Sequence, residues 1–92
     1  MAPAPEFSIV LPAHNEAGNI APMVAELKRA MAGVGGTEII CIDDGSDDLT
    51  LNELRTAAAA DSTVRYISFT RNFGHEAALR AGLRHACGWG MA

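Results

Sequence analysis

The stretch EIICIDDGSDDLT, residues 38–50, decides how the chain folds. Its first five residues, 38–42, of which the last four are apolar, predict a buried β-strand. Four of the six residues that follow, 43–48, are aspartates. An apolar strand that leads directly into this much negative charge indicates that the strand ends at the mouth of a polar site.

The rest of the chain alternates apolar runs with helical patterns. We expect strands at 7–11, 38–42 and 64–69 and helices at 18–32, 49–60 and 75–86. Three sets of residues are expected to face the core, one from each helix: Ile20, Met23, Val24, Leu27 and Met31; Leu51, Leu54 and Ala58; and Ala78, Leu79 and Leu83. The βαβαβα order predicts an α/β fold with an open parallel sheet and right-handed helical crossovers.

Length and composition limit the classes of function. The 92 residues suffice for one domain, in which residues 1–6 (MAPAPE) form a loose lead-in. A net charge of −4 without a basic patch weighs against nucleic acid as a partner. The sequence holds neither a signal-peptide pattern nor the ~20-residue apolar stretch that a membrane helix needs, so we expect any membrane contact to be peripheral. Cys41 and Cys87 form no CxxC pair and are expected to be reduced packing residues in a cytoplasmic protein.

The unusual polar residues lie in the three loops that follow strands: PAHNE (12–16), DDGSDD (43–48) and TRNFGHE (70–76). The loops that precede strands, GVGGT and ADST, are ordinary turn material. In parallel α/β sheets, ligands bind outside the carboxyl ends of the strands. The sequence therefore predicts one binding site at that edge of the sheet.

The acidic loop offers several roles. Asp43 and Asp44 can accept hydrogen bonds from a ribose or a base, or lie near a divalent cation, and some contact must offset their mutual repulsion. Gly45 permits a turn with positive φ. Asp47 and Asp48 are expected to cap the next helix rather than to bind a ligand.

The other two loops are also open to more than one interpretation. Asn15 can cap the first helix, while Glu16 can face a ligand. Arg71 suits a phosphate or a planar base, or it neutralises the aspartates across the mouth of the site. Gly74 would let the backbone approach a ligand closely.

Several common motifs are absent from the sequence. Leu79 stands where the second histidine of HExxH would be, and there is no GxGxxG, Walker GK[ST] or GxSxG pattern. His14 has no second histidine or cysteine at metal-binding spacing, so we assign no metal ligand. A receiver-type signalling domain is disfavoured because the acidic cluster follows the second strand and Thr70-Arg71 follows the third.

Three blocks, SIVLPAHNE, EIICIDDGSDD and ISFTRNFGHEAALRAGL, together resemble the amino-terminal part of family-2 glycosyltransferases over about residues 7–88. The resemblance is to the branch that moves a sugar from a nucleotide to polyprenyl phosphate. It implies a GT-A fold with a Rossmann-like half that binds a UDP- or GDP-hexose. It also implies a lipid phosphate acceptor and work at the cytoplasmic face of the membrane.

The resemblance also implies the donor-binding residues. Where the family usually has a tyrosine, this chain has His14. Glu16 matches the acidic residue that contacts the nucleoside, and Asp43 matches the carboxylate that contacts the base. The full set of nucleotide-sugar-binding residues carried over is Pro12, His14, Glu16, Asp43, Asp44, Arg71, Asn72, Gly74 and His75.

The sequence stops before the family's DxD-type motif, which holds Mg²⁺ or Mn²⁺ on the diphosphate. We therefore expect a single partial domain, 1–92, that lacks the metal ligands, the catalytic base and the acceptor half. Such a fragment is expected to be inactive alone, and the alternative function is that of a non-catalytic nucleotide-diphosphate-binding fragment. The missing strand would leave the first strand as an open edge, so self-association is also expected.

Overall fold

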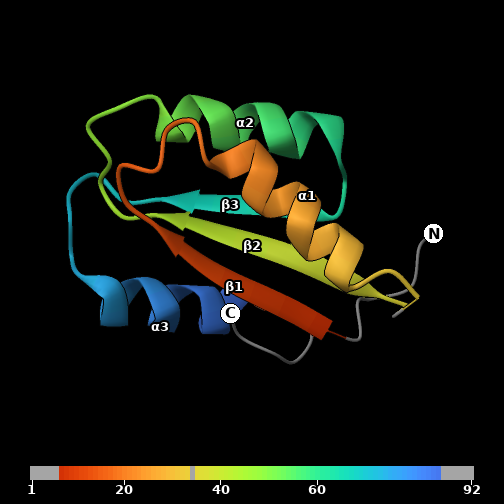
Figure 1. Cartoon of the computed structure of the whole chain (residues 1–92). Coiled ribbons are helices and arrows are strands. Elements are labelled where there is room, and N and C mark those ends of the chain that lie inside the picture. The colour runs from red at the N-terminus through yellow and green to blue at the C-terminus, as the bar shows by residue number, and fades with distance from the viewer. Residues whose placement is uncertain (1–6, 34, 86–92) are drawn as a thin grey trace.

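A computed structural model describes residues 7–33 and 35–85. Six elements alternate along the chain: β1 (Phe7–Ala13), α1 (Ile20–Ala30), β2 (Thr37–Asp43), α2 (Thr50–Ala60), β3 (Val64–Ser68) and α3 (His75–His85). The three strands are parallel and lie in the order β1-β2-β3. Helices α1 and α2 cover one face of the sheet, and α3 covers the other (Figure 1). The predicted open parallel α/β sheet is confirmed.

Strand β2 forms the centre of the molecule because it is paired on both sides and covered on both faces. Its side chains alternate, so that Ile39 and Cys41 pack under α1 and α2 while Ile40 and Ile42 pack against α3. All four are at most 2% exposed. Burial also raises the pKa of the Cys41 thiol to about 11, which fits the packing role expected for this cysteine. Cys87 lies outside the described residues.

Element ends differ from the sequence predictions by at most two residues. Strand β1 continues through Pro12 to Ala13 rather than ending at Leu11. A proline is tolerated there because β1 is an edge strand: among the described strands it pairs only with β2. Helix α1 is shorter than expected and begins at Ile20.

The prediction for the inner face of α3 was partly wrong. Ala78 is fully buried and Leu79 packs against the same cluster, but Leu83 is 52% exposed. Gly82, one turn beyond Ala78, faces the sheet instead, and a Cβ built on it would lie 2.2 Å from Cγ1 of Val10. The helix approaches β1 more closely than a leucine side chain would allow, which turns Leu83 toward solvent.

A buried carboxylate ties the start of the sheet to the end of α3. Glu38 is 3% exposed, and it accepts hydrogen bonds from the Ser8 hydroxyl (2.5 Å) and from Nη1 of Arg65 (2.6 Å). Arg65 also donates to the carbonyl of His85 (3.2 Å). In the described residues, no helix has the length and apolar character required to cross a membrane.

Candidate functional site

The loops that follow the three strands meet at one end of the sheet, as the sequence predicted (Figure 1). They are the first loop, residues 12–16, the second or acidic loop, residues 43–48, and the third loop, residues 70–76. Backbone hydrogen bonds continue the strand pairing into them. The Asp44 N–H donates to the Ala13 carbonyl (2.8 Å), and the Phe69 N–H donates to the Asp43 carbonyl (2.8 Å). The polar residues of all three loops are therefore held within reach of one another.

Asp43 and Asp44 point to opposite faces of the sheet, because side chains alternate along an extended chain. Asp43 is 2% exposed and lies on the same side as Cys41. Its Oδ1 accepts a hydrogen bond from the Ser46 N–H (3.1 Å), and its Oδ2 accepts one from the Ser68 hydroxyl (3.1 Å). These donors compensate the buried charge, and the alternation separates the two neighbouring carboxylates.

Asp44 is joined to both neighbouring loops. Its carboxylate accepts hydrogen bonds from the backbone N–H groups of Phe73 (Oδ1, 2.8 Å) and Gly74 (Oδ2, 3.1 Å), which immediately precede α3. Its carbonyl lies 2.8 Å from Nδ1 of His14. Since a carbonyl only accepts, Nδ1 of His14 carries the proton. Asp44 is 4% exposed.

That tautomer makes Nε2 of His14 an acceptor. The side-chain amide of Asn72 donates to it at 3.2 Å, and that of Asn15 lies at 3.4 Å. The Oδ1 atom of Asn72 accepts from the Gly74 N–H (2.8 Å), so the same side chain also fixes its own loop. His14 and Asn72 thus connect the first loop to the third.

Asn15 does not cap α1, contrary to the expectation, because Asn19 occupies the N-cap position. Asn15 adopts a positive φ of 53° and bonds to the acidic loop: its N–H donates to the Ser46 hydroxyl (3.0 Å), and its Oδ1 accepts from the Asp47 N–H (2.8 Å). Asparagine tolerates this left-handed conformation better than most residues. Its function here is to join the first loop to the second.

Neither aspartate occupies the N-cap position of α2, contrary to the expectation, but Asp48 bonds the first residue of the helix. Asp48, which precedes the N-cap residue Leu49, accepts hydrogen bonds from the Thr50 N–H (2.9 Å) and from the Thr50 hydroxyl. The hydroxyl bond is the main cause that lowers the pKa of Asp48. In the described residues, the exposed carboxylate of Asp47 makes no such bond.

Two further contacts place Glu16. Its N–H donates to the buried hydroxyl of Thr50 (2.8 Å), and its Oε2 accepts from the side-chain amide of Asn19 (3.1 Å). Two residues further along the chain, the Gly18 N–H donates to the carboxylate of Glu53. The backbone around Glu16 is therefore anchored to α2, while its half-buried side chain lines a hollow.

Gly45 allows the second and third loops to touch through their backbones. It has a φ of +66°, as expected, and a Cβ built on it would lie 2.2 Å from the carbonyl carbon of Arg71 and 2.3 Å from N of Asn72. A side chain at this position would overlap backbone atoms that cannot rotate away. Gly74 also has a positive φ, +97°, but is open to solvent on the side where a Cβ would lie.

Arg71 is exposed and lies over the Phe73 ring, with Cζ 4.6 Å from the ring centre. Phe73 in turn packs edge-on against Phe69, with 5.5 Å between the ring centres. Within residues 7–33 and 35–85, Arg71 forms no ion pair with an aspartate. The contacts therefore favour a guanidinium that is held by an aromatic ring and available to an anion, over one that neutralises the acidic loop.

Two adjoining hollows cover this end of the sheet and share His14 and Asn72 in their walls. The first has a volume of about 490 Å³ and contains seven of the nine predicted residues: Pro12, His14, Glu16, Asp44, Asn72, Gly74 and His75. The second has a volume of about 610 Å³ and contains the other two, Asp43 and Arg71. Ser46, Ser68 and Phe69 also line the second hollow, although the sequence did not predict them as binding residues.

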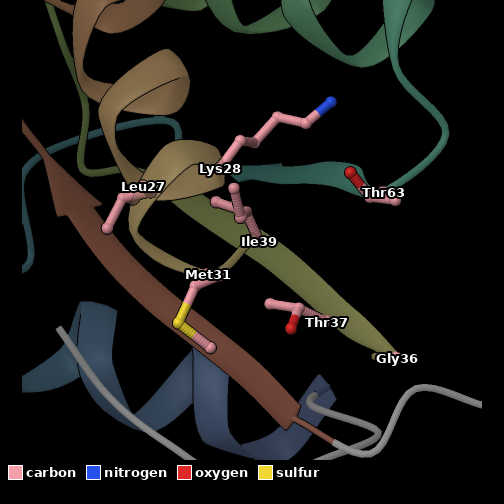
Figure 2. A pocket seen from close by; sticks show the side chains of 7 residues that line it. All are labelled: Leu27, Lys28, Met31, Gly36, Thr37, Ile39 and Thr63. Atoms are coloured by element: carbon pink, nitrogen blue, oxygen red, sulfur yellow. The ribbon is translucent and has the colours of Figure 1, made fainter. Parts of the chain in front are cut away.

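Another hollow, of about 300 Å³, lies at the opposite end of the sheet. Figure 2 shows it between the end of α1, with Leu27 and the C-cap residue Met31, and the first half of β2, with Thr37 and Ile39. The ammonium group of Lys28, at its rim, forms an ion pair with Asp61. This hollow is mostly apolar and far from the three polar loops, so the candidate site is the one at the other end of the sheet.

A divalent metal finds no ready ligand set in the part of the chain that the structure describes. No group of three or more histidine, cysteine, aspartate or glutamate side chains is placed to hold an ion there. Asp43 and Asp44 face opposite sides and already accept protein hydrogen bonds. The described residues therefore do not fit the Mg²⁺ or Mn²⁺ that the family resemblance implies.

Comparison with known proteins identifies the family. Residues 8–88 match Glycosyl transferase family 2. The chain belongs to this family. The resemblance seen in the three sequence blocks is thereby confirmed, and the Rossmann-like arrangement of β1 to α3 agrees with it.

Three curated relatives give the extent of the match. Glycosyltransferase sll0501 of Synechocystis sp. is 39% identical over 84 residues, which are 90% of this chain and 26% of that protein. The bactoprenol glucosyl transferase of Shigella phage SfV is 41% identical over 85 residues, 90% of this chain and 27% of the relative. The undecaprenyl-phosphate 4-deoxy-4-formamido-L-arabinose transferase of Salmonella paratyphi B is 34% identical over 89 residues, which are 95% of this chain and 27% of the relative. The chain thus spans about a quarter of the length of these relatives.

Proposed function

We propose that this chain is the donor-binding part of a glycosyltransferase that moves a hexose from a UDP- or GDP-sugar to a polyprenyl phosphate. The observation that carries the proposal is the meeting of the three strand-end loops around two hollows that share His14 and Asn72. Each hollow, of about 490 and 610 Å³, has the volume of a small-molecule site, since such sites measure about 300–1,000 Å³.

The residues divide by chemistry. The ribose hydroxyls and the base are hydrogen-bond donors, and Glu16 supplies a carboxylate oxygen, Oε1, to accept from them. Asp43 lines the second hollow, and each of its oxygens, which already accepts one protein hydrogen bond, has a second lone pair for the base. Arg71 supplies a fixed positive charge for the diphosphate. His75, the first residue of α3, adds a second donor at the rim of the first hollow.

The lipid acceptor is proposed from the names of two relatives, which refer to bactoprenol and to undecaprenyl phosphate. With such an acceptor, the enzyme would work at the cytoplasmic face of the membrane. We assign acceptor binding, the catalytic base and metal binding to parts of the enzyme outside the described residues. This chain would then bind the donor without transferring the sugar.

Calorimetric titration of the 92-residue chain with UDP and with GDP tests donor binding. We expect one of the two nucleotides to bind, and we expect Glu16→Gln and Arg71→Ala each to weaken that binding by about tenfold, the value of one lost charge-assisted hydrogen bond. Glu26→Gln, a change of the same charge on the exposed side of α1, is the control and should bind as the unmodified chain does. Absence of heat with both nucleotides would contradict the proposal.

A second assay separates donor binding from catalysis. The chain is incubated with undecaprenyl phosphate and a radiolabelled UDP- or GDP-hexose, and the lipid fraction is counted. We expect no label in the lipid. Label there would show that this chain carries its own catalytic machinery and would overturn the assignment of the base to another part of the enzyme.

A further inference from the structure

We propose that Asp44 is a positioning residue, which acts on the donor nucleotide through the loops that it holds and not by touching the ligand. This inference rests on the proposed function, since it assigns one residue of that site a role different from direct binding. It is carried by the hydrogen bonds of Asp44, all four of which lead to the other two loops of the site.

Each polar group of Asp44 forms a hydrogen bond with a residue of the first or the third loop. The N–H bonds the Ala13 carbonyl, and the carbonyl accepts from the His14 ring, so the backbone fixes the first loop. The two carboxylate oxygens take the N–H groups of Phe73 and Gly74, so the side chain fixes the third loop. The residue is 4% exposed, although it borders the first hollow.

The charge of Asp44 suits this place. Phe73 and Gly74 immediately precede α3, where the positive end of the helix dipole favours an anion. Hydrogen bonds from backbone N–H groups to a carboxylate are about twice as strong as neutral ones. A carboxamide of the same shape would lose the charge and one of the two acceptors, so one N–H group would be released.

The consequence for the ligand is indirect. The third loop carries Arg71, Asn72 and His75, all proposed to face the donor, and its two central N–H groups are those that Asp44 holds. The contrast with Glu16 is informative, because the Glu16 carboxylate bonds only the nearby Asn19 amide among the described residues. Glu16 therefore keeps Oε1 for a ligand, whereas both oxygens of Asp44 hold N–H groups of the third loop. Both oxygens of Asp43 are engaged too, but by Ser46 of its own loop and Ser68 of β3, so Asp43 does not hold the third loop.

Hydrogen exchange measured by NMR on the nucleotide-free chain tests the anchoring. In Asp44→Asn we expect the amide of Phe73 to exchange at least about tenfold faster than in the unmodified chain, the effect of one lost charged hydrogen bond. The amide of Gly74 should change less, because it also bonds Oδ1 of Asn72. The amide of Cys41 in β2 should be unchanged, which excludes global unfolding as the cause. Glu26→Gln is the matched control and should leave all three amides unchanged.

Calorimetry on the same variants tests the link to the ligand. We expect Asp44→Asn to weaken nucleotide binding by about tenfold at a temperature where it is as fully folded as the unmodified chain. Weaker binding with unchanged exchange would indicate direct contact and overturn the proposal. Faster exchange with unchanged affinity would overturn it as well.

A measurement on the unmodified chain covers the case in which the variant does not fold. Scalar couplings across the hydrogen bonds, between the amide nitrogens of Phe73 and Gly74 and the side-chain carboxyl carbon of Asp44, should be detectable. Their absence would refute the anchoring whether or not any nucleotide binds. Failure of the proposed function would instead show as no binding by the unmodified chain, with the couplings present.

Discussion

Replacing Gly45 by alanine places a methyl group where the backbone of the third loop already lies. The new Cβ would be 2.2 Å from the carbonyl carbon of Arg71 and 2.3 Å from N of Asn72. Neither atom belongs to a flexible side chain, so one of the loops must move. Alanine would also have to adopt the φ of +66° that glycine holds without strain.

The size of the effect follows from these two costs. The left-handed conformation costs an L-residue about 1–2 kcal/mol. Forcing a methyl group into packed atoms costs about 1–3 kcal/mol. Together they amount to about 2–5 kcal/mol, a large share of the roughly 5–15 kcal/mol by which small domains are stable.

Two other glycines separate the costs. Gly33 has a φ of +88° with nothing near its Cβ position, and Gly35 has open space and no positive φ. We expect Gly35→Ala to be neutral or slightly stabilising, and Gly33→Ala to cost about 1–2 kcal/mol from strain alone. Gly45→Ala should exceed Gly33→Ala by the clash, about 1–3 kcal/mol.

Urea unfolding followed by circular dichroism measures all three variants. The free energies of unfolding should fall in the order Gly35→Ala, Gly33→Ala, Gly45→Ala, and nucleotide affinity should fall only in the last. Equal destabilisation by Gly33→Ala and Gly45→Ala would refute the close approach of the second and third loops.

Three further predictions concern other parts of the molecule. The pKa of Asp61 is lowered from its usual 3.8 to about 2, mainly by the hydrogen bond from Lys28 on α1 and then by Thr63. Because the folded-state pKa is the lower one, stability that is present above pH 4 should be lost as the pH falls toward 2. Thermal melts of Asp61→Asn should not show this dependence on pH. In a Cys87→Ser background, Cys41 should react with dithionitrobenzoate at pH 8 far more slowly in the folded chain than in urea, since burial raises its pKa to about 11; equal rates would contradict its burial. Sedimentation should detect concentration-dependent association of the chain through the edge strand β1. Phe7→Lys should weaken this association, because a charge on an edge strand blocks pairing. Leu49→Lys, at another exposed apolar residue, should leave the association unchanged.

The fold was predictable because its signals are local. The isoleucine-rich run of β2 and the 3.6-residue spacing in α1 each need only a short window of sequence. The inner face of α3 was not predictable from the sequence, because Ala78 and Leu79 each begin a plausible row of apolar residues along the helix. Only the packing distance to β1 decides that Gly82 rather than Leu83 faces the sheet. The pairing of the buried Glu38 with Arg65 was likewise not predictable, since the two residues are 27 positions apart.

The convergence of the three loops was predictable, but the contacts among them were not. Parallel strands send their following loops to one edge, so the convergence of the three loops required only the order of elements. The opposite orientation of Asp43 and Asp44 could have been read from the two-residue period of a strand. The partners of these carboxylates, Ser68 and the N–H groups before α3, depend on tertiary packing that no local pattern encodes.

The central claim is that a nucleotide binds where the three strand-end loops meet, and NMR chemical-shift mapping with UDP and GDP tests it most directly. We predict that the amide shifts caused by the nucleotide that binds concentrate in residues 12–16, 43–48 and 70–76. Shifts that concentrate instead around Leu27, Thr37 and Thr63, at the apolar hollow of Figure 2, would contradict the account.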